Sequence, residues 1–183
     1  MRFLSALLFS LLAFNLYASD LTRADVERWI KTHGELQSWL DQHQEQLPDE
    51  DFANTNLSME ELMAKGIQQL RTAGLYNEFN RRVQRAGFSN VEHWAKLGQQ
   101  ISLTYMAIGL EENPQALGMF EAQLRELRSA RDIPAEEKAM YEAMLNESIN
   151  MMRQAQRMSS ASKAAVRPYQ RQLEELFDQE DSY

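Results

Sequence analysis

Residues 101–110, ISLTYMAIGL, are a run whose only polar side-chain groups are the hydroxyls of Ser102 and Thr104 and the phenol of Tyr105. The segment before it, VEHWAKLGQQ (91–100), is half polar. Charged residues flank the apolar run, which is much shorter than the roughly 20 apolar residues that a helix needs to cross a bilayer. We therefore interpret it as part of a helix in the core of a globular domain.

The apolar residues of this region fall on two faces of one helix. The first face, with spacings of three and four residues, consists of Val91, Trp94, Gly98, Ile101, Tyr105 and Ile108. The second face is confined to the second half and consists of Leu103, Met106 and Leu110. Because a helix that is apolar on every side is buried on every side, we expect a helix at 90–111 whose second half crosses the centre of a bundle. Gly98, Ala107 and Gly109 would let neighbouring helices approach closely.

Helix start and stop signals divide the rest of the chain. Ser58 and Ser89 each stand three residues before a glutamate, which is the pattern of a capping box. Gly74 and Gly87 follow periodic segments and are typical helix stops. The predicted helices are 22–46, 58–73, 75–86, 90–111, 114–130, 134–158 and 163–178. The sequence thus predicts an all-α, single-domain bundle of six or seven mostly antiparallel helices over 20–178, followed by a frayed acidic tail at 179–183.

The first nineteen residues, MRFLSALLFSLLAFNLYAS, have the organisation of a secretory signal peptide. Arg2 supplies the positive start, residues 3–14 are mostly apolar, and Ala18 or Ser19 offers a small residue for cleavage. Such an apolar segment is too short for a comfortable membrane span. We expect a periplasmic or secreted protein with no stable membrane anchor after cleavage, and an uncleaved N-terminal anchor is the alternative.

The composition excludes several classes of protein. The chain has no cysteine, so it forms no disulfide and no thiolate metal site. Its net charge is −8; without residues 1–19, which hold Arg2 and no acid, 18 basic residues face 27 acidic ones, a net of −9. Phosphate backbones repel such a chain, so we expect no nucleic acid partner. We interpret the cluster of Arg81, Arg82 and Arg85 as a solvated helix face.

Methionines are concentrated in the predicted helix at 134–158. Spacings of four and seven residues place on one face Met140, Met144, Met151 and Met158. Met fills irregular gaps in cores and also makes adaptable binding surfaces, so we interpret this face as core, with a ligand or partner groove as the alternative. Tyr105 and Met106 would complete such a groove. Met140 and Met144 alone are close enough to share Cu(I), and we expect no metal or other cofactor.

Two histidines fall within an apolar seam of the first predicted helix. The seam repeats every three or four residues and consists of Val26, Trp29, His33, Leu36, Leu40, His43 and Leu47. If Gly34 does not break the helix, His33 and His43 lie about 15 Å apart, too far to share a metal ion. Burial disfavours a charged imidazolium, so both are candidate pH-sensing residues, and the alternative is that they are ordinary residues at the edge of the core.

No catalytic signature is present in the sequence: there is no G-x-S-x-G, no Gly-rich phosphate loop and no H-E-x-x-H. Adjacent pairs such as Glu111-Glu112 diverge on a helix. We therefore expect an exported, non-enzymatic adaptor that binds another envelope or secreted protein. The alternative is a carrier of a small apolar or lipid-like ligand in a cavity of the bundle.

Overall fold

The structure, a computed structural model, describes residues 20–48 and 59–180, and in these residues it is all helical, without a strand. This confirms the predicted all-α bundle. The expected signal peptide at 1–19, the expected cap at Ser58 and residues 181–183 lie outside the described residues. The elements are α1 (Arg23–Asp41), η1 (Gln44–Gln46), α2 (Met59–Thr72), α3 (Tyr76–Arg85), α4 (Val91–Glu112), α5 (Ala116–Ser129), α6 (Ala135–Ala155), α7 (Ser160–Val166), η2 (Arg167–Tyr169) and α8 (Gln170–Glu180).

The first and last helices differ most from their predicted boundaries. The helix predicted at 22–46 runs unbroken through Gly34 but ends at Asp41, and a turn and η1 follow it. The helix predicted at 163–178 is divided at Pro168, which has no N–H to donate to the preceding turn. The short helix α7 begins earlier than predicted, because Ser159 caps it, and α8 continues to Glu180, two residues into the predicted tail.

The two predicted glycine stops are confirmed, whereas one predicted cap is wrong. Gly74 and Gly87 adopt φ values of 73° and 92°, the left-handed conformation that glycine tolerates at a helix end. The N-cap of α4 is Asn90, whose side chain accepts a 2.8 Å hydrogen bond from the His93 amide, and not Ser89. Asparagine caps as well as serine does, so the start moves by one residue, and the Ser89 hydroxyl lies 3.0 Å from His93 Nδ1.

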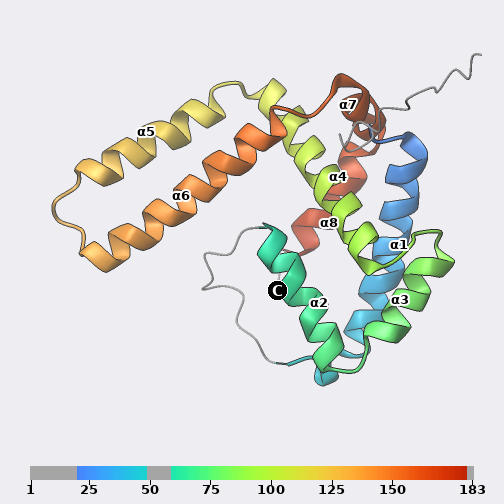
Figure 1. Cartoon of the computed structure of the whole chain (residues 1–183). Helices are drawn as coiled ribbons and strands as arrows, with labels where there is room; N and C mark the ends of the chain where they lie inside the picture. The colour runs from blue at the N-terminus through green and yellow to red at the C-terminus, as the bar shows by residue number, and fades with distance from the viewer. Residues whose placement is uncertain (1–19, 49–58, 181–183) are drawn as a thin grey trace, which may run out of the picture.

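α4 is the central helix of the bundle and packs against α1, α2, α3, α6 and α7 (Figure 1). Its buried residues are Val91, Gly98, Ile101, Thr104, Ala107 and Ile108. Burial on every side is nevertheless wrong for its second half, because Leu103, Met106 and Leu110 are half-buried and Gly109 is exposed. A surface groove lined in part by Met106, Gly109 and Leu110 leaves this side of α4 open.

Where α1 packs on α4, the Trp29 indole lies directly against Gly98. A Cβ atom added to Gly98 would lie 2.7–2.8 Å from three atoms of that ring, which is closer than van der Waals contact allows. The Trp29 indole N–H donates a 3.2 Å hydrogen bond to the Trp94 carbonyl, and the two indoles stack with centroids 6.0 Å apart. Gly98 therefore provides the space that α1 occupies.

The beginning of the described chain is held by a helix near its end. The Leu21 amide donates a 3.0 Å hydrogen bond to the hydroxyl of Ser162 in α7, and the Ser162 side chain is buried. Thr22 then caps α1 in a capping box with Asp25. The first turn of α1 thus begins against α7.

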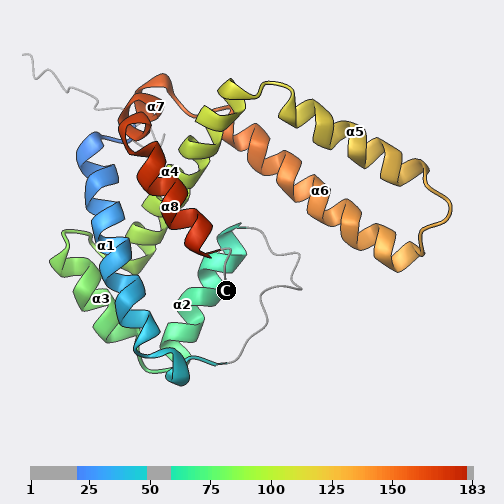
Figure 2. The same ribbon diagram turned by 180° about the vertical axis from the view of Figure 1, so that it is seen from behind.

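α5 and α6 form a helical hairpin, here called the arm (residues 116–155), which projects from the rest of the bundle (Figures 1 and 2). The arm leaves and rejoins the bundle at the same end of α4, and α6 also packs against α4. Ion pairs join its two helices: Arg128 lies 3.1 Å from Glu142, and Arg153 lies 2.9 Å from Glu121. The prediction of a single all-α bundle did not anticipate this projection.

The C-terminal end of α4 is joined to α7 and η2 by two charged contacts on Glu111. Its carboxylate lies 2.6 Å from Lys163 Nζ and also accepts a hydrogen bond from the Arg167 guanidinium. The hydrogen bond from Lys163 holds the pKa of Glu111 below its usual value of 4.5, and Arg167 acts in the same direction. Because Glu111 and Arg167 are exposed and Lys163 is only half-buried, solvent screens much of the attraction.

Substitution of Gly98 by Ala should lower the free energy of unfolding by about 1–3 kcal/mol, the usual cost of overfilling a packed site. Gly109→Ala is the matched control on the same helix, because a Cβ atom there meets nothing within 4 Å. It should raise stability by about 0.5–1 kcal/mol, since alanine is the better helix former. Urea unfolding of both variants measures this difference, and equal effects would contradict the Trp29–Gly98 contact.

Glu111→Gln should lower the thermal midpoint more at about pH 7 than at about pH 4. A carboxylate whose folded pKa is depressed stabilises the protein above its unfolded pKa, and this contribution disappears as pH falls through the folded pKa. Glu112→Gln is the control, because that carboxylate accepts a 3.4 Å hydrogen bond from the neutral Gln170 amide. A Glu111→Gln effect that did not change with pH would contradict the role assigned to this carboxylate.

Candidate functional site

The candidate groove residues named from the sequence lie at separate places in the structure. Tyr105 and Met106 line the groove at the end of α4, where the Tyr105 ring meets the edge of Phe177 with centroids 5.5 Å apart. Met140 and Met144 lie on the arm. About 16 Å of helix separates Met140 from Met151. The structure thus does not bring these residues into one groove.

The methionines of the predicted face also differ in exposure. Met140 is 44% exposed and Met144 is 54% exposed, whereas Met151 is half-buried, and so is Met158, which lies beyond the end of α6 at Ala155. The interpretation of the whole face as core is therefore wrong for the first two residues. Met140 and Met144 are exposed because the arm projects from the bundle. The start of α6 packs against α5 alone, and its outer face meets no further helix.

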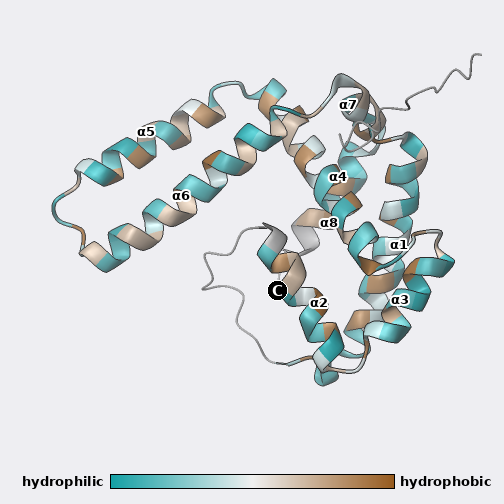
Figure 3. Ribbon diagram, viewed as in Figure 1, coloured by the Kyte–Doolittle hydropathy of each residue, from teal (hydrophilic) through white to brown (hydrophobic). Residues whose placement is uncertain are grey.

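Across residues 20–48 and 61–177, the large hydrophobic side chains that are exposed all belong to the arm: Met119 (65%), Met140, Tyr141 (41%) and Met144. Figure 3 shows hydrophobic residues at several places along α5 and α6. Scattered apolar residues are normal on a protein surface, whereas a patch of them on one element indicates an interaction site.

A groove of about 490 Å³ runs along the arm between its two helices. It is lined by Phe120, Gln123, Leu127, Tyr141, Met144, Leu145 and Ser148. On α5 these residues follow spacings of three and four, and on α6 spacings of three, one and three, so each helix contributes one face. The groove is apolar along its length, and Gln123 and Ser148 add polar side chains to it.

Of the residues that line this groove, sequence reasoning singled out only Met144. It did not single out Met119, Phe120 and Leu127 of α5, nor Tyr141 and Leu145 of α6. The spacing from Phe120 to Leu127 is the ordinary pattern of an amphipathic helix. That pattern shows that α5 has an apolar face but does not show whether another helix covers it.

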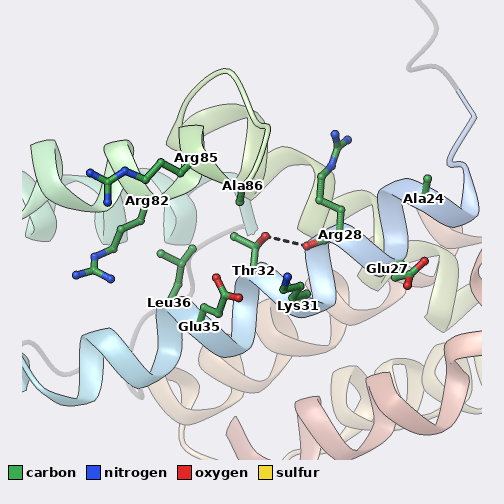
Figure 4. Close-up of a pocket in the computed structure, with 10 residues that line it drawn as sticks. All are labelled: Ala24, Glu27, Arg28, Lys31, Thr32, Glu35, Leu36, Arg82, Arg85 and Ala86. Atoms are coloured by element: carbon green, nitrogen blue, oxygen red, sulfur yellow. Dashed lines mark hydrogen bonds between the residues drawn. The ribbon is translucent and has the colours of Figure 1, made fainter.

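A polar trough between α1 and α3 is a second candidate (Figure 4). Its volume is about 640 Å³, and it is lined by Ala24, Glu27, Arg28, Lys31, Thr32, Glu35, Leu36, Arg82, Arg85 and Ala86. Arg28 pairs with Asp25 at 2.7 Å and Arg82 pairs with Glu78 at 2.8 Å. The hydrogen bond from Arg82 lowers the pKa of Glu78. Charges of both signs that pair within their own helices fit a solvated surface better than a site for one anionic ligand.

The histidines of the predicted seam lie at the edge of the core. His33 is half-buried, with its ring centroid 4.9 Å from that of Trp29. His43 follows α1 in a turn, where its Nδ1 lies 2.8 Å from the Trp39 carbonyl oxygen. The buried face of α1 keeps Val26, Trp29 and Leu36 of the predicted seam. It includes Thr32 and Trp39 in place of His33 and Leu40. A pH-sensing role for His33 and His43 stays a prediction.

Other kinds of site receive no support from the described residues. Within them, no group of three or more His, Asp or Glu side chains is placed to hold a metal ion, and no helix is long and apolar enough to cross a membrane. Comparisons with known protein families, with curated proteins and with solved structures find no match for this chain.

Mild peroxide should oxidise Met119, Met140 and Met144 before the half-buried Met106 and Met151, because exposed thioethers react first. Peptide mapping by mass spectrometry at increasing peroxide concentrations measures the order. The same mapping in denaturant is the control, since unfolding should remove the difference. Early oxidation of Met106 together with slow oxidation of Met144 would contradict the exposure of the arm.

Proposed function

We propose that this protein is an exported, non-enzymatic adaptor whose arm binds a helical segment of another protein. The observation that supports this most strongly is the concentration of exposed large hydrophobic side chains on one projecting hairpin, of which Tyr141 and Met144 line the groove between its helices. A monomer gains no stability by exposing these side chains. Binding of another protein to the arm would explain why they are exposed.

The shape of the groove favours a helix as the occupant. Two antiparallel helices with an apolar groove between them resemble part of a helical bundle that a further helix would complete. An amphipathic helix binds such a groove through residues spaced like those of its walls. The methionines can adapt to side chains of different shape, because their thioethers are flexible and polarizable.

The extent of the surface favours a reversible partner over a stable homodimer. The seven groove residues together with Met119 and Met140 make nine side chains. Stable interfaces involve roughly 20–30 residues on each side. An occupant of this groove alone would therefore form a small interface, typical of a transient contact. The signal-peptide pattern at 1–19 supports a partner in the periplasm or outside the cell.

The experiment begins with a photo-crosslinking amino acid placed at position 144, or at position 150 as the control. Asn150 is exposed on the same helix but does not line the groove. The expected result is an adduct with one other protein from position 144 only. That protein is then identified and purified, and its affinity for the parent chain is measured.

In the purified pair, Met144→Glu should weaken binding by about tenfold or more, because the interface would then bury an unpaired charge. Asn150→Glu adds the same charge on α6 outside the groove and should leave the affinity unchanged. An adduct at twice the mass of the chain would overturn the proposal in favour of self-association. Equal weakening by both variants would show that the groove is not the binding site.

A further inference from the structure

Two carboxylates border the groove of the arm, one on each helix. Glu126 of α5 comes three residues after Gln123, and Glu147 of α6 comes three residues after Met144. Gln123 and Met144 both line the groove. Residues three apart are neighbours on the surface of a helix, so each carboxylate lies beside a residue that lines the groove.

Both carboxylates point away from the contact between the two helices. Glu126 is two residues from the buried Leu124, and Glu147 is two residues from the buried Ile149. A step of two residues turns the chain by about 200° around a helix axis. Each carboxylate therefore lies on the outer edge of the groove, opposite the buried side of its own helix.

The two carboxylates also lie at about the same level along the arm. The antiparallel helices are held in register by the ion pairs Arg128–Glu142 and Arg153–Glu121. Counting along the helices from these pairs places Glu126 opposite residues 144–148 of α6, a stretch that includes Glu147. The groove thus has one carboxylate on each edge over the same turn of helix.

Neither carboxylate has a partner of its own. In the part of the chain that the structure describes, no ion pair or side-chain hydrogen bond involves the carboxylate of Glu126 or that of Glu147. Glu126 also lies in the last turn of α5, where the negative end of the helix dipole disfavours an acid. The contacts of the arm therefore do not account for either acid.

The basic side chains of α5 and α6 are engaged elsewhere or lie on the far side. They are Arg125, Arg128, Lys138 and Arg153. Arg128 and Arg153 pair with glutamates across the arm, and the Lys138 amine donates hydrogen bonds of 2.6 and 3.0 Å to two carbonyls at the end of α5. Arg125 is two residues from Leu127, so it points away from the groove. The edges of the groove are therefore acidic.

These charges bear on which helix the groove can accept. A helix seated in the groove removes water from the carboxylates beside it, and this desolvation costs free energy unless a cation takes the place of the water. A Lys or Arg on each side of the apolar stripe of the helix would supply that cation. Opposite charges across an interface also speed association and exclude partners of the wrong sign.

We propose that the helix that binds the arm is basic. Its apolar stripe lies in the groove, and a Lys or Arg on each side of the stripe pairs with Glu126 or Glu147. This inference rests on the proposed function of the arm and adds to it the charge of the partner. Because the two carboxylates lie at about the same level, the two pairs fix the position of the helix along the groove, as edge charges do in coiled coils.

The test uses two model peptides of about 20 residues, long enough to form a helix. One carries Lys on both sides of a stripe of Leu, and the other carries Glu at the same positions. Fluorescence anisotropy of the labelled peptides gives their affinities for the purified protein. The Lys peptide should bind about tenfold or more tightly than the Glu peptide. A photo-crosslinking amino acid at position 144, and not at position 150, should capture it.

Glu126→Gln combined with Glu147→Gln should weaken binding of the Lys peptide by about two- to tenfold, the value of two exposed ion pairs. Glu45→Gln combined with Glu174→Gln is the matched control, because it removes the same charge from exposed positions outside the arm. The control should leave the affinity almost unchanged. It separates pairing at the groove from the general attraction of a cationic peptide to a chain of net charge −8.

Glu126→Lys combined with Glu147→Lys should reverse the preference, so that the Glu peptide binds more tightly. Neither residue belongs to the buried core, and a lysine suits the end of α5 better than an acid does. These variants should therefore remain folded, and circular dichroism checks that they do.

Four results would each overturn the proposal: no binding of the Lys peptide, equal affinity of the parent for both peptides, equal weakening by the two pairs of Gln substitutions, or a preference for the Lys peptide that survives the change to lysine. None of them decides the proposed function of the arm. If the crosslinker at position 144 captures a protein whose bound helix is neutral or acidic, the arm is an adaptor whose partner is not selected by charge.

Discussion

The contact of the Trp29 indole with Gly98 fixes how the first helix lies on the central one, and the remaining helices depend on that placement. The ring occupies the space that any other residue at position 98 would fill. Its N–H is bonded to the Trp94 carbonyl, so α1 is restrained both along α4 and in rotation. This rotation buries Thr32 and leaves His33 at the edge of the core. α4, held in this way, supports α2, α3, α6 and α7.

The fold class and most helix boundaries follow from local chemistry, which a single sequence contains. The periodic face through Ile101 and Ile108 is buried as predicted, and the helices stop at Gly74 and Gly87 because the left-handed conformation is needed there. What failed was the inference from an apolar helix to complete burial, since Gly109 is exposed. Periodicity shows that a side chain is apolar, but its burial depends on which helices lie beside it.

The same limit explains why only part of the candidate site could be predicted. Met144 was recognised as belonging to an apolar face, but its exposure depends on the projection of the arm, which no local pattern reveals. Phe120 and Leu127, which line the other side of the groove, have only the spacing of an ordinary amphipathic helix.

In terms of chain entropy, the arm is a long loop whose two ends are held close together. It leaves and rejoins the bundle at one end of α4, while the Leu21–Ser162 hydrogen bond closes the chain over a separation of 141 residues. The entropy lost in closing a loop grows only with the logarithm of its length, by about 0.6 kcal/mol for each doubling. The bundle is therefore nearly indifferent to the length of the hairpin between α4 and α7. A longer or shorter arm would change how far the groove extends from the bundle while leaving the closure of α1 against α7 almost as favourable as before.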